Sequence, residues 1–137
     1  MNLPHKDDIY NFCWWIMSVA LLMICFCGVC RAETGQASWY SVESCQREGT
    51  SGVWTASGEA FKNEGLTCAM RSRDFGKYYK VTNLNNGKSV IVKHNDFGPN
   101  KKLHKQGRII DLSKRAFASI ANLKQGIINV KVDEVKI

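Results

Sequence analysis

The sequence has no internal repeat and no low-complexity tract, and its 137 residues include only two prolines and three histidines. Cysteine is scarce in the larger part of the chain, because four of the six cysteines precede residue 31 and only Cys45 and Cys68 follow. No Cys/His spacing in this later part fits a zinc or iron site. The sequence therefore gives no reason to expect a metal or another cofactor, and its length allows one domain and an N-terminal extension.

Long hydrophobic runs are also absent, except at residues 12–30, where almost every residue is apolar. This length lies between that of a signal-peptide core and that of a membrane-spanning helix. The residues before it carry more acidic than basic side chains, which is unlike the positive start of a typical signal peptide. We expect residues 1–32, called the leader below, to be a signal peptide cleaved after Ala32 or, alternatively, a retained membrane anchor. Both alternatives predict export.

Acidic side chains are the minority outside the leader. The leader holds two basic and two acidic residues, so residues 33–137 hold 17 Lys and Arg against 10 Asp and Glu, and the net charge of +7 belongs to them. A basic surface attracts anionic polymers, lipids or nucleic acid without distinguishing among them. Because we expect export, the expected partner is a cell-wall polymer and not nucleic acid.

The two cysteines outside the leader have two alternative states. In an oxidising compartment Cys45 and Cys68 can pair, and we expect a disulfide between them. The alternative is two reduced, buried thiols. The disulfide is expected only if the protein is exported from the reducing cytosol.

The later part of the chain contains short runs in which apolar and polar residues alternate, the pattern of half-buried strands. Two such runs, at residues 78–83 and 89–95, flank an Asn-Gly pair within residues 84–88. Asn-Gly supplies the positive φ angles of a tight turn, so these runs are predicted to form a hairpin. Further strand-like runs occur at residues 109–110 and 128–132.

Helical patterns are few. Ser113 is placed to cap a helix over residues 112–122, in which apolar residues share one face. Residues 42–57 are rich in Ser, Gly, Thr and Glu and predict a long loop. Many short strands with one brief helix predict a small all-β barrel.

Three carboxylates are candidates for acid/base chemistry: Glu59, Asp96 and Asp111. An acid that cleaves a glycan must hold its proton near neutral pH, which requires burial or a neighbouring carboxylate. Asp111 follows an apolar pair that can bury it, but it is equally well placed to cap the next helix. Asp96 precedes a Gly-Pro turn, and its position alone favours a turn role.

Several blocks of sequence resemble the rare lipoprotein A family, double-psi β-barrel proteins of the bacterial cell envelope described as lytic transglycosylases. The resemblance covers residues 35–135, with the blocks in the expected order. They are QASWY at 36–40, TASGEAF at 55–61, LT at 66–67, VTNLNNGKSV at 81–90 and SVIVKHNDFGPNKKLHKQGRIIDLS at 89–113.

The resemblance implies a six-stranded double-psi β-barrel over residues 33–137, with one or two short helices. It implies a lyase that cleaves the bonds between N-acetylmuramic acid and N-acetylglucosamine within peptidoglycan strands, preferably strands without stem peptides. The products would carry 1,6-anhydro ends. We expect a monomer located in the cell envelope and attached to a membrane if residues 12–30 are retained.

The resemblance also assigns roles to the acids. Asp96 occupies the position of the family's favoured catalytic acid, and Glu59 is expected beside it in the groove. Asp111 matches a carboxylate that the related expansins need for wall loosening. We expect all three in one cleft, where mutual repulsion raises one pKa. Asp96 would donate a proton to the glycosidic oxygen and then accept one from the muramic C6 hydroxyl. Glu59 and Asp111 would orient Asp96 or stabilise the positive charge that develops at C1.

One position departs from the family pattern. Where the family has Leu-Thr-Ala-Ala-His, this chain ends the block with Met70, which cannot carry a proton. This departure predicts weakened turnover. His94 is a candidate substitute and substrate contact, although an exposed strand histidine is the favoured interpretation.

Other side chains are candidates for contact with sugars. Aromatic rings at Trp39, Tyr40 and Trp54 can stack on sugars or pack in the core. Thr55 and Ser57 can supply hydroxyl contacts. A predicted basic loop would suit an acidic polymer, although such runs are usually solvated; its basic residues are Lys101, Lys102, Lys105 and Arg108.

The alternative function is a wall-binding or wall-loosening module without catalysis, like the expansins. Met70 favours this alternative, whereas the intact Glu59 and Asp96 blocks favour the enzyme.

Overall fold

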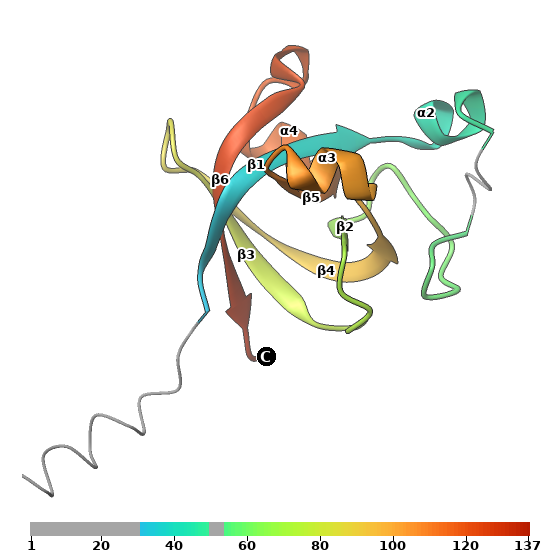
Figure 1. Cartoon of the computed structure of the whole chain (residues 1–137), viewed down its shortest axis with the longest axis horizontal. Helices are drawn as coiled ribbons and strands as arrows, with labels where there is room; N and C mark the ends of the chain where they lie inside the picture. The colour runs from blue at the N-terminus through green and yellow to red at the C-terminus, as the bar shows by residue number, and fades with distance from the viewer. Residues whose placement is uncertain (1–30, 50–53) are drawn as a thin grey trace, which may run out of the picture. The chain divides into compact units, whose positions relative to one another are not determined.

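The computed structural model describes residues 31–49 and 54–137 (Figure 1). Residues 12–30, on which the prediction of a signal peptide or membrane anchor rests, lie outside the described residues. In chain order the elements are β1 (Glu33–Tyr40), α2 (Val42–Arg47), β2 (Thr67–Met70), β3 (Tyr78–Asn83), β4 (Ser89–Phe97), α3 (Lys101–Lys105), β5 (Arg108–Ser113), α4 (Lys114–Ile120), the 3-10 helix η1 (Leu123–Gln125) and β6 (Ile127–Val135).

The six strands close into a barrel in the order β1-β5-β2-β4-β3-β6. Two neighbouring pairs are parallel, β1 with β5 and β2 with β4, and the remaining pairs are antiparallel. This confirms the predicted six-stranded all-β barrel. Closure leaves no free sheet edge, and α2 and α3 lie outside the strands (Figure 1).

The barrel interior is filled by alternate residues of each strand. On β5, Ile110 and Leu112 are fully buried, and on β4 the same is true of Val92. Phe117 and Ile120 of α4 join this core. Since successive strand residues point to opposite faces, the residues between these core positions face outward.

Most predicted elements are confirmed. The strand at 78–83 has the predicted bounds, and β4 extends two residues past the predicted run, to Phe97 before Gly-Pro. The hairpin turn contains Gly87 with a φ of 74°. Ser113 caps α4, although this helix covers only Lys114–Ile120.

Two predicted loops contain helices, so the described residues hold three α-helices and one 3-10 helix instead of one or two helices. The predicted loop at 42–57 begins with α2, which Ser41 caps by accepting from the Ser44 amide. The predicted basic loop contains α3, capped by Asn100. Short side-chain caps stabilise these single turns, and the sequence pattern did not reveal them. Among the described residues no helix is both long and apolar enough to cross a membrane.

Ser113 gives a test of the packing of α4. Its buried hydroxyl donates to the Gly65 carbonyl at 2.5 Å and accepts from the Ala116 amide at 3.3 Å. Replacing Ser113 by Ala removes the cap and leaves the partly buried Gly65 carbonyl without this donor, so the free energy of unfolding in urea should fall by about 1–2 kcal/mol. Ser119→Ala, on the exposed side of the same helix, should change it by less than about 0.5 kcal/mol. Equal effects would contradict this account.

Candidate active site

Strand register brings two of the three predicted acids together. Ala69 of β2 pairs with Asp96 on β4 and with Asp111 on β5. Neighbouring strands lie about 4.8 Å apart, so the Cα atoms of the two aspartates are separated by roughly 10 Å across one alanine. The small Ala69 side chain leaves the space between the carboxylates open.

A β-bulge turns Asp96 to this face. Cys68 pairs with His94 and the next residue, Ala69, pairs with Asp96, so Asn95 is an extra residue in β4. With strict alternation Asp96 would follow Val92 and His94 into the barrel interior. The bulge shifts the alternation by one residue, and Asp96 therefore faces outward like Asp111.

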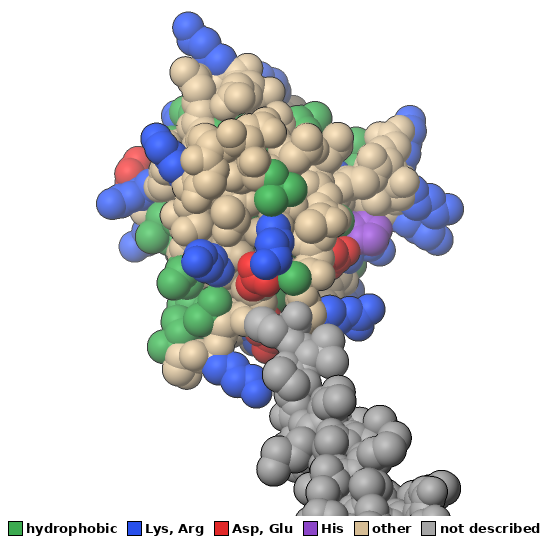
Figure 2. Space-filling model, turned by 90° about the vertical axis from the view of Figure 1, so that its left-hand side faces the viewer, with side chains coloured by type: hydrophobic (Ala, Val, Ile, Leu, Met, Phe, Trp, Pro, Cys, Tyr) green, Lys and Arg blue, Asp and Glu red, His purple; other side chains and the backbone are tan. Residues whose placement is uncertain are grey.

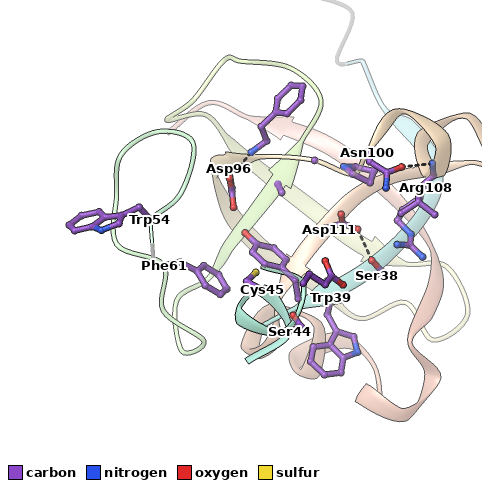
Figure 3. Close-up of a pocket in the computed structure, with 17 residues that line it drawn as sticks. Ser38, Trp39, Ser44, Cys45, Trp54, Phe61, Asp96, Asn100, Arg108 and Asp111 are labelled. Carbon is purple, nitrogen blue, oxygen red and sulfur yellow. Dashed lines mark hydrogen bonds between the residues drawn. The ribbon is translucent and has the colours of Figure 1, made fainter. Parts of the chain in front are cut away.

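Both aspartates line a pocket of about 510 Å³ on the outer side of the barrel wall. Figure 3 shows their side chains pointing into the same space. The walls come from β1, from α2, from the segment 54–61, and from the end of β4 with α3. The lining residues are Ser38, Trp39, Tyr40, Ser44, Cys45, Glu48, Trp54, Phe61, Ala69, Asp96, Phe97, Gly98, Pro99, Asn100, Leu103, Arg108 and Asp111.

Asp111 is the more deeply placed acid, and its pKa is raised. Burial is the main cause, and the nearby charge of Asp96 adds to it, whereas the Ser38 hydroxyl and the Arg108 guanidinium oppose it. Ser38 donates to Asp111 Oδ1 at 2.5 Å. The capping role considered for Asp111 is wrong, because Ser113 caps α4 and Asp111 lies inside β5. A carboxyl with a raised pKa is suited to donating a proton.

Asp96 is held at the pocket mouth by backbone donors. Its Oδ1 accepts from the Ala56 amide at 3.0 Å and from the Phe97 amide at 2.8 Å. Two N–H donors fix the orientation of a carboxylate acceptor. The Ala56 contact also ties the segment 54–61 to the end of β4.

Glu59 does not join the two aspartates, so the expectation of three acids in one cleft holds only for two. Its carboxylate pairs with Lys93 and accepts from Asn95 Nδ2 at 2.9 Å, and it is not among the pocket-lining residues. The hydrogen bond from Lys93, followed by that from Asn95, lowers the pKa of Glu59. An acid held in its charged form is a poor proton donor.

The predicted aromatic contacts all line the pocket. Trp39 donates through its indole nitrogen to the Leu123 carbonyl at 3.1 Å and also packs against the core. The ring of Tyr40 stacks on Phe61 with centroids 4.6 Å apart. Trp54, 63% exposed, lies at the outer edge in Figure 3. Burial, and then the charge of Asp96, raises the pKa of Tyr40.

Three predicted substrate contacts lie elsewhere. Thr55 and Ser57 bond to each other at 3.0 Å inside their own turn and do not line the pocket. His94 is fully buried, so the expectation of an exposed strand histidine is wrong. Because its ring is inside the barrel, on the face opposite the pocket, His94 cannot contact a polymer there.

The structure contains no disulfide between Cys45 and Cys68, which corrects that prediction. Cys68 faces the barrel core from β2, and burial raises the pKa of its thiol. Cys45 lines the pocket from α2. In the part of the chain that is described, no group of three or more His, Cys, Asp or Glu is arranged to hold a metal ion.

Sequence reasoning missed Ser38, Phe97 and Gly98. Ser38 alternates with core residue Ala37, and its pairing with Asp111 follows only from the β1–β5 register. Gly98 lies beside Asp111 in the pocket wall, and a Cβ there would lie at ordinary contact distance, 3.5 Å, from Asp111 Oδ2. Phe97 is flanked by the guanidinium groups of Arg71 and Arg73, at 5.2 and 5.1 Å from its ring centre.

Comparisons with known proteins indicate the family. The sequence model of a family described as "Lytic transglycolase" matches residues 32–132. A Synechocystis protein named "Probable endolytic peptidoglycan transglycosylase RlpA" is 43% identical over 106 residues, covering 77% of this chain and 30% of that protein. A Rickettsia felis protein named "Endolytic peptidoglycan transglycosylase RlpA" is 43% identical over 101 residues, covering 74% of this chain and 41% of that protein.

The match spans less than half the length of either curated relative. Among solved structures, a mutant expansin from Clavibacter michiganensis in complex with cellohexaose has a TM-score of 0.55 and 21% identity, covering 77% of this chain and 51% of that chain. At this identity the likeness shows the shared fold alone.

The opposite pKa shifts of Asp111 and Glu59 predict opposite effects on stability. Below the usual Asp pKa of 3.8 the carboxyl of Asp111 is protonated whether folded or unfolded. As pH rises toward the raised folded pKa, the unfolded state ionises first and stability falls. Asp111→Asn should therefore raise the free energy of unfolding at pH 7, by about 0.5–2 kcal/mol, and should have no effect below pH 3.8.

The control is Glu59→Gln, which should act in the other direction. The lowered pKa of Glu59 means that its charge stabilises the fold at neutral pH and that this contribution is lost as pH falls. Urea unfolding of both variants between pH 3 and 7 measures the two trends. If Asp111→Asn instead lowered the free energy of unfolding at pH 7, burial of the ionised Asp111 carboxylate would not be destabilising, and the argument from its raised pKa would be contradicted.

Proposed function

Because the chain belongs to the lytic transglycolase family, we propose that it is a peptidoglycan lytic transglycosylase, a lyase that cuts within glycan strands. It cleaves the bond between N-acetylmuramic acid and N-acetylglucosamine and leaves a 1,6-anhydro end. The observation that carries this proposal is the pair Asp96 and Asp111 in one pocket, on opposite sides of Ala69.

The two aspartates divide the acid and base steps. Asp111, whose pKa is raised by burial, donates its proton to the glycosidic oxygen as the bond from C1 to that oxygen breaks. Asp96, oriented by two amides, accepts the proton of the C6 hydroxyl, whose oxygen forms the new bond to C1. No water is consumed. A proton that passes from Asp96 back to Asp111 restores the starting state.

Glu59 acts indirectly in this scheme. It accepts from Asn95, the extra residue of the bulge, and Asn95 in turn accepts through its carbonyl from the Ser57 amide at 3.0 Å. These contacts fix the segment that presents Asp96, so Glu59 is a positioning residue.

The pocket suits a sugar polymer. Trp54 and Phe97 are partly exposed apolar faces on its rim, and Tyr40 and Phe61 form a stacked wall. Aromatic faces of this kind pack against sugar rings.

Arg108 explains a preference for strands without stem peptides. Its guanidinium lines the pocket near Asp111 and makes no ion pair or hydrogen bond within residues 31–49 and 54–137. Removing the stem peptide exposes the lactyl carboxylate of the muramic acid, which a guanidinium fork binds through paired hydrogen bonds.

Export to the cell envelope follows from this substrate. Peptidoglycan lies outside the cytosol, and the apolar leader gives the route, as a cleaved signal or a membrane anchor. Basic side chains are spread over the face seen in Figure 2 and are not gathered in one patch. Such a surface favours general attraction to an anionic wall.

A second candidate function is a wall-binding module without catalysis. Met70 favours it, because it replaces the family's histidine with a side chain that cannot transfer a proton. Met70 packs partly against the core and does not line the pocket, so proton transfer depends on the two aspartates alone.

The test of the enzyme is the appearance of anhydro ends. The purified full chain incubated with peptidoglycan should release anhydro-muramyl products detectable by mass spectrometry. Asp96→Asn and Asp111→Asn should each reduce their rate by about 10²–10⁴-fold, the usual contribution of acid/base groups. Asp133→Asn, on the far strand β6, is the control and should retain the rate. Tight binding without these products would support the module instead.

The test of Arg108 compares two substrates. On glycan strands stripped of stem peptides, Arg108→Ala should raise KM by roughly 10-fold or more, because a charge-assisted hydrogen bond pair is lost. On strands that keep their peptides the change should be small. Arg108→Lys should recover part of the affinity. Equal increases of KM on both substrates would show that Arg108 does not bind the lactyl carboxylate.

A further inference from the structure

His94 is a fully buried titratable side chain that the proposed reaction does not use. It lies on the interior face of β4, where its ring contacts Phe75 and Tyr79 at centroid distances of 5.1 and 6.1 Å. A polar ring in such a place needs partners for its nitrogens.

Both ring nitrogens face backbone carbonyls. Nε2 lies 3.0 Å from the Asp96 carbonyl oxygen, and Nδ1 lies 3.2 Å from the Asp74 carbonyl oxygen. Carbonyl oxygens only accept, so each contact is a hydrogen bond only when the ring nitrogen carries a proton. A neutral ring can serve one of the two carbonyls, and the protonated ring serves both.

The contact with Asp96 spans the bulge. Asn95 is the extra residue between His94 and Asp96, and it breaks the regular ladder at that point. The His94 ring reaches past Asn95 to the peptide group of Asp96. A side chain that bonds across a bulge holds the irregular backbone in the one conformation that sends Asp96 outward.

The backbone of His94 ties the same point to the segment before β3. The His94 amide donates to the Lys77 carbonyl at 2.8 Å, and the His94 carbonyl accepts from the Gly76 amide at 2.8 Å. With the Nδ1 contact to Asp74, the residue links segment 74–77 to the end of β4. The carboxylate of Asp96 is thus held by amides from outside and its backbone by His94 from inside.

We propose that His94 is a positioning residue for Asp96, acting through the hydrogen bond from its Nε2 to the Asp96 carbonyl. This inference rests on the proposed function, since it concerns the placement of the catalytic base. It departs from the expectation that His94 touches substrate or carries protons. Its role is to keep the bulge that separates the pocket face from the barrel interior.

Three substitutions separate the two ring contacts. Gln places its amide nitrogen near the position of Nε2, so His94→Gln keeps a donor for the Asp96 carbonyl. Asn places its amide nitrogen near Nδ1, so His94→Asn keeps only the Asp74 contact. His94→Val removes both. Val92→Ala, at the inward position two residues earlier, is the control for loss of core packing alone.

The expected result is a rescue by Gln. His94→Val and His94→Asn should lower kcat for anhydro-product formation by about 10- to 100-fold with KM changed less than threefold, because a displaced base fails mainly in the reaction step. His94→Gln should recover most of kcat. Val92→Ala should lower the melting temperature while kcat, measured below that temperature, stays close to that of the unaltered chain.

A second readout is the pH profile. The charge of Asp96 contributes to the raised pKa of Asp111, so a displaced Asp96 should move the high-pH limb of kcat to lower pH in His94→Val and His94→Asn but not in Val92→Ala. Similar activity of the Asn and Gln variants, or an unchanged pH profile in all, would overturn the proposal and leave the enzyme function intact. Absence of anhydro products from the unaltered chain would overturn both.

Discussion

The bulge at Asn95 is the constraint on which the site depends. On β4, Val92 and His94 point into the barrel, and regular alternation would send Asp96 after them. One extra residue places Asp96 on the outer face, level with Ala69 and Asp111. The two buried polar residues of β4, His94 and Asn95, both lie at this bulge. His94 bonds to the Asp96 carbonyl and Asn95 to the Glu59 carboxylate.

Pairing two aspartates across an alanine sets the electrostatics of the pocket. Asp111 is enclosed by the barrel wall and bonded to Ser38, whereas Asp96 sits at the mouth and accepts two amides. The same residue type therefore occupies two environments, and the environments assign different roles to it. Burial is the main cause that raises the pKa of Asp111, and the charge of Asp96 adds to it. Met70 packs partly against the core and is not among the residues that line the pocket.

The segments outside the barrel form much of the pocket wall. The end of α2, the segment 54–61 and α3 surround the acids and supply Cys45, Trp54, Phe61 and Leu103, whereas Arg108 comes from the barrel strand β5. In the proposed function the barrel provides rigid positions for the two aspartates, and the connecting segments provide the surfaces that would contact a polymer. Glu59 belongs to the connecting segments, and its link to Asn95 couples the two parts.

The sequence by itself determined the strands, the hairpin and the all-β barrel class, since alternation and Asn-Gly chemistry act locally. The motif blocks also led us to expect Asp96 and Asp111 in one cleft, where the structure has them. The sequence did not determine that Glu59 stands apart, that His94 is buried, or that Cys45 and Cys68 are not bonded. These depend on register and on a single extra residue in β4. Only the tertiary structure decided them, because a one-residue shift reverses which side chains face the pocket without changing the local pattern.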